Sequence, residues 1–171
     1  MAAKKDNVKL VYSSDPEAPN QANLVRSAID ANVDGIAVTL PNAEAICPAA
    51  RDAVDQGIPV VGLNAGMDVY QDYGLSGFFG QDETVAGRAA GERLHEEGKQ
   101  KVLCVIHEQG NTSQEARCNG IREGLGGGAV ELLYVNGQDL TSVQSTITSK
   151  LTQDPSFDTV FALQAPVAMR A

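Results

Sequence analysis

The adjacent pair His107 and Glu108 is the first candidate for chemistry, because an imidazole beside a carboxylate can transfer protons. The pair follows an apolar run of strand length, Val102 to Ile106, and consecutive residues of a strand point to opposite faces. The two side chains are therefore poorly placed to act as one acid and base couple. The sequence also contains no GxSxG or HExxH motif, and no cysteine lies in a recognisable nucleophile motif. We predict that the chain is not an enzyme.

The glycine pattern and the charge disfavour phosphate-bearing ligands. The 17 glycines include no GxxxxGK[ST] loop, and Gly126 to Gly128 follow a predicted helix, a position where glycine ends helices. The net charge of -9 repels a phosphate backbone, and the 13 Lys and Arg are scattered along the chain. We expect no nucleotide cofactor, and no nucleic-acid partner through this segment.

Three cysteines, Cys47, Cys104 and Cys118, fit neither a metal site nor a disulfide framework, because no CxxC pair occurs and their number is odd. We therefore expect no metal, and we interpret the three as buried small apolar residues. The alternative is a disulfide between Cys104 and Cys118, which flank one strand-end loop and could pair in an oxidising compartment.

Polar side chains, most of them uncharged, follow the apolar runs. In open parallel sheets, ligands bind beyond the carboxyl ends of the strands, so these residues are the candidates for binding. Amides, hydroxyls and a few charges suit a neutral, hydroxyl-rich ligand, which needs many directional hydrogen bonds. The residues are Ser13 to Asp15, Pro41 and Asn42, Asn64 to Gly66, His107 to Gln109, Asn136 to Asp139, and Gln164.

Arg117 is a further candidate, because it lies in a predicted helix that follows one of these strand-end loops. Asn111, Thr112 and Ser113 can cap this helix and keep its N-terminal end near a ligand. A guanidinium group binds adjacent hydroxyls well. The alternative is an ordinary solvated arginine at the surface.

The elements that must position these residues alternate between strands and helices. Runs rich in Val, Ile and Leu have strand length, and the segments between them carry apolar residues at helical spacing, as at Val85, Ala89 and Leu94. This order is typical of an α/β fold with parallel sheets covered by helices. The predicted strands are Val8 to Tyr12, Gly35 to Leu40, Ile58 to Leu63, Val102 to Ile106, Val130 to Val135 and Thr159 to Leu163.

The stretch Met67 to Gly80 is the longest without helical periodicity, and it separates three strand-and-helix units from three more. No Pro- or Ser-rich linker divides the chain. We therefore predict two lobes, 1–80 and 81–171, with the crossover in this stretch. Asp82 then caps the first helix of the second lobe.

Five stretches in order carry a family resemblance: VDGIAVTLPN with AVDQGIPVVGLNAG, then FFGQDETVAGRAAGERL, GNTSQEARCNGIREGL and VNGQDLTSVQSTITSKLTQDPSFDTVFAL. In this combination the chain resembles the ribose- and galactose-type periplasmic sugar-binding proteins. Their fold, two Rossmann-like lobes, is shared by the ligand-binding core of lac-repressor-like regulators. The resemblance implies a small sugar or polyol bound between the lobes, without chemistry, by a component of an ABC-type transporter. The alternative is the ligand-sensing domain of a transcriptional regulator.

The resemblance also implies site residues, a partner and a location. Ala65 stands where ribose-type members have arginine, which argues for another ligand than ribose. The implied partner is a membrane permease and the implied location is extracytoplasmic. No apolar run reaches the roughly 18 to 20 residues that span a bilayer, and Met1 to Asn7 is too polar for a signal peptide. The implied contacts, together with two strand-end residues, are Asn64, Arg117, Gln164, His107, Asn111, Gln138, Asn42 and Ser13.

Members of this family are usually close to twice as long. They begin with a strand and a helix that have no counterpart here, and they continue beyond the helix that begins near Ala165. We therefore expect both lobes to be partial, incomplete at both termini, with exposed strand edges that favour association.

Overall fold

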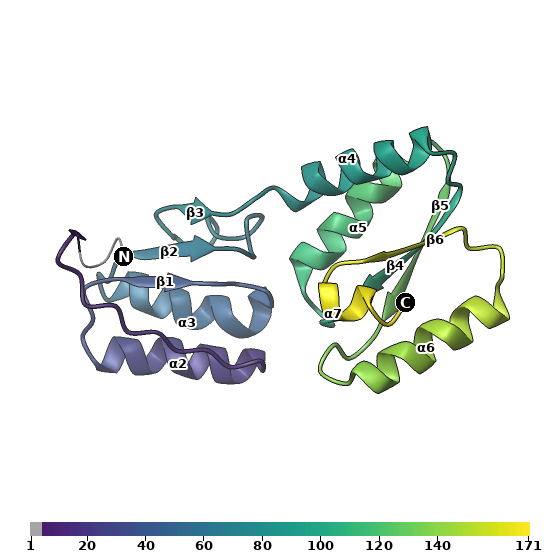
Figure 1. Cartoon of the computed structure of the whole chain (residues 1–171). Helices are drawn as coiled ribbons and strands as arrows, with labels where there is room; N and C mark the ends of the chain where they lie inside the picture. The colour runs from purple at the N-terminus through teal and green to yellow at the C-terminus, as the bar shows by residue number, and fades with distance from the viewer. Residues whose placement is uncertain (1–4) are drawn as a thin grey trace.

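The computed structural model describes residues 5–171, in which strands and helices alternate along the chain except that β3 directly follows β2 (Figure 1). The helices are α2 (Ala18–Asp30), α3 (Ala43–Asp55), α4 (Glu83–Glu96), α5 (Thr112–Gly124), α6 (Leu140–Gln153) and α7 (Ala165–Ala168). The strands are β1 (Ile36–Val38), β2 (Val60–Leu63), β3 (Phe78–Phe79), β4 (Lys101–Ile106), β5 (Ala129–Tyr134) and β6 (Thr159–Ala162).

The strands form two parallel sheets of three, in the orders β1-β2-β3 and β5-β4-β6. Figure 1 shows them in two bodies, which we call the N-terminal lobe (with α2 and α3) and the C-terminal lobe (with α4 to α7). Residues 80–82 join the lobes between β3 and α4. The predicted α/β class is confirmed. Strand β3 was not predicted, since its two residues lie within the expected crossover.

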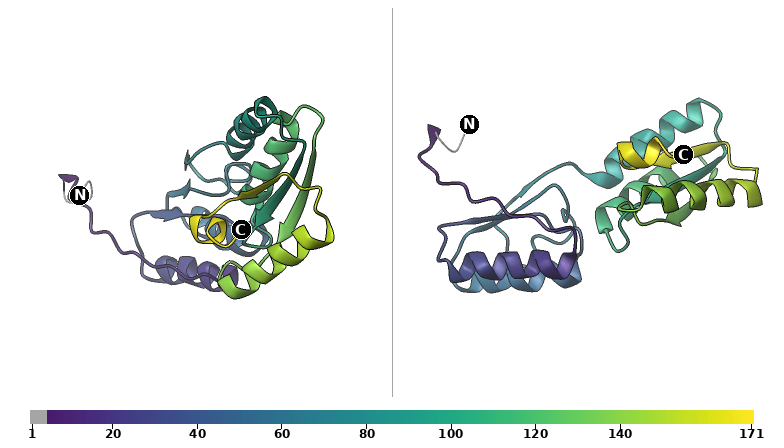
Figure 2. Two further views of the ribbon diagram at one scale, coloured as in Figure 1. Left: turned by 45° about the vertical axis from the view of Figure 1, so that its right-hand side comes forward. Right: turned by 60° about the horizontal axis from the view of Figure 1, so that its bottom comes forward.

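Helices cover the two sheets differently. In the N-terminal lobe α2 and α3 lie on the same side of the sheet (Figure 2). In the C-terminal lobe the central strand β4 is buried on both faces. Val102, Cys104 and Ile106 pack with residues of α5 on one side, and Val105 packs with residues of α6 and α7 on the other. Alternate residues of a strand point to opposite faces, so one apolar run builds two cores.

The prediction of a strand at Val8 to Tyr12 is wrong. This segment has no regular secondary structure, and Leu10 and Tyr12 are 74% and 81% exposed. Within the described residues, β1 pairs only with β2. An apolar, β-branched segment does not become a strand by propensity alone, because its backbone needs a neighbouring strand to bond.

Helices α4 and α5 pack against each other through glycines, two on each helix. Gly87 and Gly91 of α4 are buried against α5, and Gly120 and Gly124 of α5 are buried against α4. A Cβ on any of the four would overlap a carbonyl oxygen of the facing helix, so the backbones touch directly. The apolar spacing of Val85, Ala89 and Leu94 correctly predicts the helix, but Val85 and Ala89 are exposed and only Leu94 packs against the core. Apolar spacing misses a face whose contact residue is glycine.

We predict that Gly120→Ala lowers the free energy of unfolding by about 2 kcal/mol, because its methyl group meets the Thr84 carbonyl oxygen and the helices must move apart. This loss outweighs the roughly 1 kcal/mol that Ala gains over Gly inside a helix. Denaturant unfolding measures the change. The control is Gly77→Ala, where an added Cβ meets nothing within 4 Å. Equal stability of the two variants would contradict direct backbone packing.

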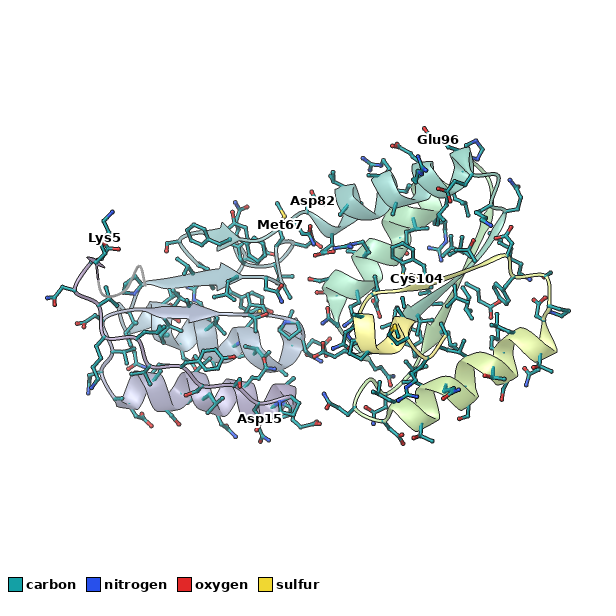
Figure 3. All side chains as sticks on the ribbon, viewed as in Figure 1. Lys5, Asp15, Met67, Asp82, Glu96 and Cys104 are labelled. Atoms are coloured by element: carbon teal, nitrogen blue, oxygen red, sulfur yellow. A yellow bond between two sulfur atoms is a disulfide. The ribbon has the colours of Figure 1, made fainter. Side chains whose placement is uncertain are left out.

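Cys104 of β4 and Cys118 of α5 form a disulfide with Cα atoms 6.0 Å apart. Both are fully buried, as Figure 3 shows for Cys104 inside the C-terminal lobe. The interpretation of Cys104 and Cys118 as unpaired buried residues is therefore wrong, and the alternative, a disulfide between them, is confirmed. Cys47 is a buried free thiol, and burial raises its pKa to about 11. The disulfide links α5 to β4, the central strand of the sheet in the C-terminal lobe.

We predict one reactive thiol in the unfolded, unreduced protein and three after reduction, because only Cys47 is free. A thiol-reactive chromophore measures both numbers. Reduction is expected to lower stability by about 3 kcal/mol, the value for a loop of about 15 residues. Cys47→Ser is the control and should give zero thiols before reduction. Three thiols without reductant would overturn the pairing.

Candidate functional site

A cavity of about 660 Å³ lies between the two lobes, at the carboxyl ends of strands β1, β4, β5 and β6. The N-terminal lobe contributes the start of α2 and the loop after β1, and the C-terminal lobe contributes the loops after β4, β5 and β6. This is the edge at which parallel sheets bind ligands. The lining residues are Pro16 to Pro19, Gln21, Pro41, Asn42, His107 to Gln109, Asn111, Tyr134 to Gln138, and Gln164.

Beside this cavity the two lobes contact each other through the first turn of α5. The backbone N–H of Thr112 donates to the carbonyl oxygen of Pro41 at 3.2 Å. The backbone N–H of Gly66 donates to Ser113 Oγ at 3.3 Å. The loops after β1 and β2 therefore both meet the N-terminus of α5, which forms one edge of the cavity.

Asn111 is the N-cap of α5 and the only buried polar residue among the described ones. Its Oδ1 accepts from the backbone N–H groups of Ser113 and Gln114 at 3.1 and 3.2 Å. Its Nδ2 donates to Glu108 Oε2 at 2.7 Å. One side chain thus ends the helix and holds a carboxylate on the cavity wall, so the predicted capping by Asn111 is confirmed.

Gln114 fixes the orientation of His107. Its Oε1 accepts from the backbone N–H of His107 at 3.0 Å, so its Nε2 amide faces the imidazole, 3.3 Å from His107 Nε2. An amide nitrogen only donates, which assigns the acceptor role to His107 Nε2 and the proton to Nδ1. Nδ1 is buried and has no partner within residues 5–171. Burial lowers the pKa of His107, and nearby Glu108 opposes this shift in part.

The charged residues that line the cavity are both acidic, Glu17 from the start of α2 and Glu108 from the loop after β4. No Lys or Arg is among the lining residues. The guanidinium group of Arg117 is paired with Glu83 at the start of α4, 34 positions earlier, and only 23% of the Arg117 side chain is exposed. The cavity therefore presents acceptors and neutral amides, with no fixed positive charge.

Of the eight residues expected to contact ligand, five line the cavity: Asn42, His107, Asn111, Gln138 and Gln164. The other three do not line it. Ser13 is exposed, Asn64 turns the chain after β2 with a φ of 62°, and Arg117 is held by Glu83. Their contact with ligand stays a prediction.

Sequence reasoning missed Glu17 and Gln114. Glu17 comes from the start of a helix and not from a strand end, so the strand-end rule does not reach it. Gln114 stands three residues after the N-cap Asn111, where a capping box places Glu or Gln. That spacing could have marked Gln114 as a residue that bonds back toward the preceding loop.

Within residues 5–171, no three His, Cys, Asp or Glu side chains lie together in a way that could hold a metal ion. None of the described helices is long and apolar enough to cross a membrane.

Comparison with known families decides the classification, because residues 1–171 match the family described as periplasmic binding protein domain. The chain belongs to the periplasmic binding protein domain family. A solved structure similar to this chain is that of a carbohydrate transporter from Acidothermus cellulolyticus 11B, in complex with myo-inositol. It is 52% identical with a TM-score of 0.94, over 99% of this chain and 59% of that one.

Two curated relatives of this periplasmic binding protein domain are named for the sugars or polyols that they bind. The xylose/arabinose-binding protein of Sulfolobus acidocaldarius is 24% identical over 168 residues, which cover 93% of this chain and 42% of the relative. The xylitol-binding protein of Mycolicibacterium smegmatis is 28% identical over 126 residues, or 72% of this chain and 35% of the relative. The chain therefore spans less than half the length of the curated relatives it matches.

We predict that the free energy of unfolding falls as the pH drops from 7 to 5, and that His107→Gln removes most of this fall. The unfolded chain takes up a proton near pH 6.5, the ordinary pKa of histidine, whereas burial keeps folded His107 neutral to lower pH. Protons then favour the unfolded state. Denaturant unfolding at both pH values measures the effect. The control is the exposed His95→Gln, and an equal pH dependence in wild type and His107→Gln would contradict the assignment.

Proposed function

We propose that this protein binds a small neutral sugar or polyol in the cavity between its lobes, as the solute-binding component of an ABC-type transporter. The observation that carries the proposal is the lining of that cavity, which is rich in amides at the carboxyl ends of four strands. Amide oxygen and nitrogen atoms match the alternating acceptors and donors of a polyhydroxylated ring. The volume of about 660 Å³ lies within the range of small-ligand sites.

The relatives support the same ligand class. The solved transporter protein with 52% identity holds myo-inositol, and the curated relatives are named for xylose or arabinose and for xylitol. All of these ligands are uncharged and carry several hydroxyl groups. These ligands differ in their carbon skeleton. They therefore support the class of ligand, and experiment must identify the individual sugar or polyol.

The role proposed for the protein is binding without chemistry. We assign ligand contacts to the amides of Asn42, Gln138 and Gln164, and keep the boundary between the lobes at residue 80. The partner proposed is the membrane permease of the transporter, and the location is extracytoplasmic. The buried disulfide supports this location, because such bonds persist in oxidising compartments.

We predict that one of myo-inositol, xylitol, D-xylose and D-arabinose raises the melting temperature of this chain at millimolar concentration. A ligand that binds only the folded state stabilises it by RT ln(1 + [L]/Kd). Gln164→Ala should raise the dissociation constant of that ligand about fivefold, because the substitution removes one amide from the cavity wall. Titration calorimetry measures the dissociation constants.

The matched control is Gln144→Ala, since Gln144 is exposed on α6 and does not line the cavity. Its dissociation constant should equal that of the wild type. The proposal fails if none of the four ligands shifts the melting temperature of this chain. It also fails if Gln144→Ala weakens binding as much as Gln164→Ala does.

A further inference from the structure

The charge of the cavity suggests a narrower ligand class than neutral sugars. Its two ionisable carboxyl groups come from opposite lobes, Glu17 from the N-terminal lobe and Glu108 from the C-terminal lobe. No lysine or arginine among the lining residues balances them. Burial lowers the pKa of His107, the one histidine among the lining residues, although nearby Glu108 opposes this shift in part.

Glu108 keeps an acceptor free for ligand. Both of its side-chain hydrogen bonds, from Asn111 Nδ2 at 2.7 Å and from Gln114 Nε2 at 3.4 Å, end on Oε2. Within residues 5–171 no hydrogen bond reaches Oε1. The two amides fix the carboxylate on the cavity wall while its second oxygen can accept a hydrogen bond from a ligand hydroxyl or amino group.

Side-chain caps already use N–H groups at three of the helix starts near the cavity. Helix N-termini commonly bind anions through their free N–H groups. Here Asn111 accepts from two N–H groups of α5, and the N–H of Thr112 donates to Pro41. Asn42 and Asp139 cap α3 and α6 in the same way. At these three starts the caps leave fewer free N–H groups for an anion, whereas the start of α2, which also lines the cavity, has no side-chain cap.

We infer that Glu108 selects ligands by charge, so that the cavity takes amino-substituted polyols as well as neutral ones and rejects those bearing a carboxylate or phosphate. This inference rests on the proposed function, because it concerns the same cavity. An ammonium group on the ligand donates to the free oxygen of Glu108 in a charge-assisted hydrogen bond. A ligand anion at the same place meets a fixed like charge, which weakens its binding.

The test compares myo-inositol, scyllo-inosamine and myo-inositol 1-phosphate by titration calorimetry, with xylitol and D-xylonate as a second pair. For wild type we expect the amino compound to bind within threefold of the neutral one or more tightly, and the anions at least tenfold more weakly. Glu108→Gln keeps the shape of the side chain and removes its charge. It should raise the dissociation constant of the amino compound about fivefold and reduce the ratio of the anion to the neutral dissociation constant at least threefold. Added salt should also reduce that penalty.

The matched control is Glu92→Gln, which removes the same charge from an exposed position of α4 outside the cavity. It should leave every ratio unchanged. The inference is overturned if a wild-type anion binds as well as its neutral counterpart, or if Glu108→Gln leaves the ratios as they were. If none of myo-inositol, xylitol, D-xylose and D-arabinose binds, the proposed function fails and this inference fails with it. If a neutral ligand binds and the ratios are unchanged by Glu108→Gln, only the charge selection is overturned.

Discussion

The capping of α5 by Asn111 is the interaction on which the site depends most. Its carboxamide oxygen ends the helix, and its nitrogen holds Glu108 on the cavity wall. The next two residues make the hydrogen bonds that join the lobes, to Pro41 and Gly66. A side chain that lost either half of this arrangement would leave buried backbone N–H groups or a carboxylate without partners, which is costly away from water. The helix end, the cavity and the contact between lobes therefore share one side chain.

Two further constraints fix where that helix end lies. The glycines bring the backbone of α5 against α4, and the disulfide ties α5 to the central strand β4. Both act on the body of the helix, whereas Asn111 acts at its end. Since close packing leaves little room for adjustment, the first turn of α5 is placed by parts of the lobe that never touch the cavity.

Much of this arrangement could be predicted from local sequence. The apolar run Val102 to Ile106 predicts a strand buried on both faces, and β4 is one. Asp82 and Asn111 cap α4 and α5 as expected from their side chains. Asn42, Gln138 and Gln164 line the cavity because each lies beyond the carboxyl end of a parallel strand.

What could not be predicted depends on partners distant in sequence. Arg117 belongs by spacing to the helix beside the cavity, yet Glu83 binds its guanidinium group from another helix. The segment Val8 to Tyr12 has the composition of a strand but pairs with no other strand among the described residues. The contact face of α4 is invisible to hydrophobic periodicity because glycine carries no side chain to signal it.

The bonds between the lobes have a consequence for how such a protein can change its ligand. Of the four atoms that make them, three belong to the backbone: the Thr112 nitrogen, the Pro41 oxygen and the Gly66 nitrogen. Backbone atoms stay in place when neighbouring side chains are exchanged. Apart from Asn111, which serves both purposes, the residues that line the cavity can therefore be exchanged while the hydrogen bonds between the lobes persist, so the ligand can change without loss of the contact between lobes.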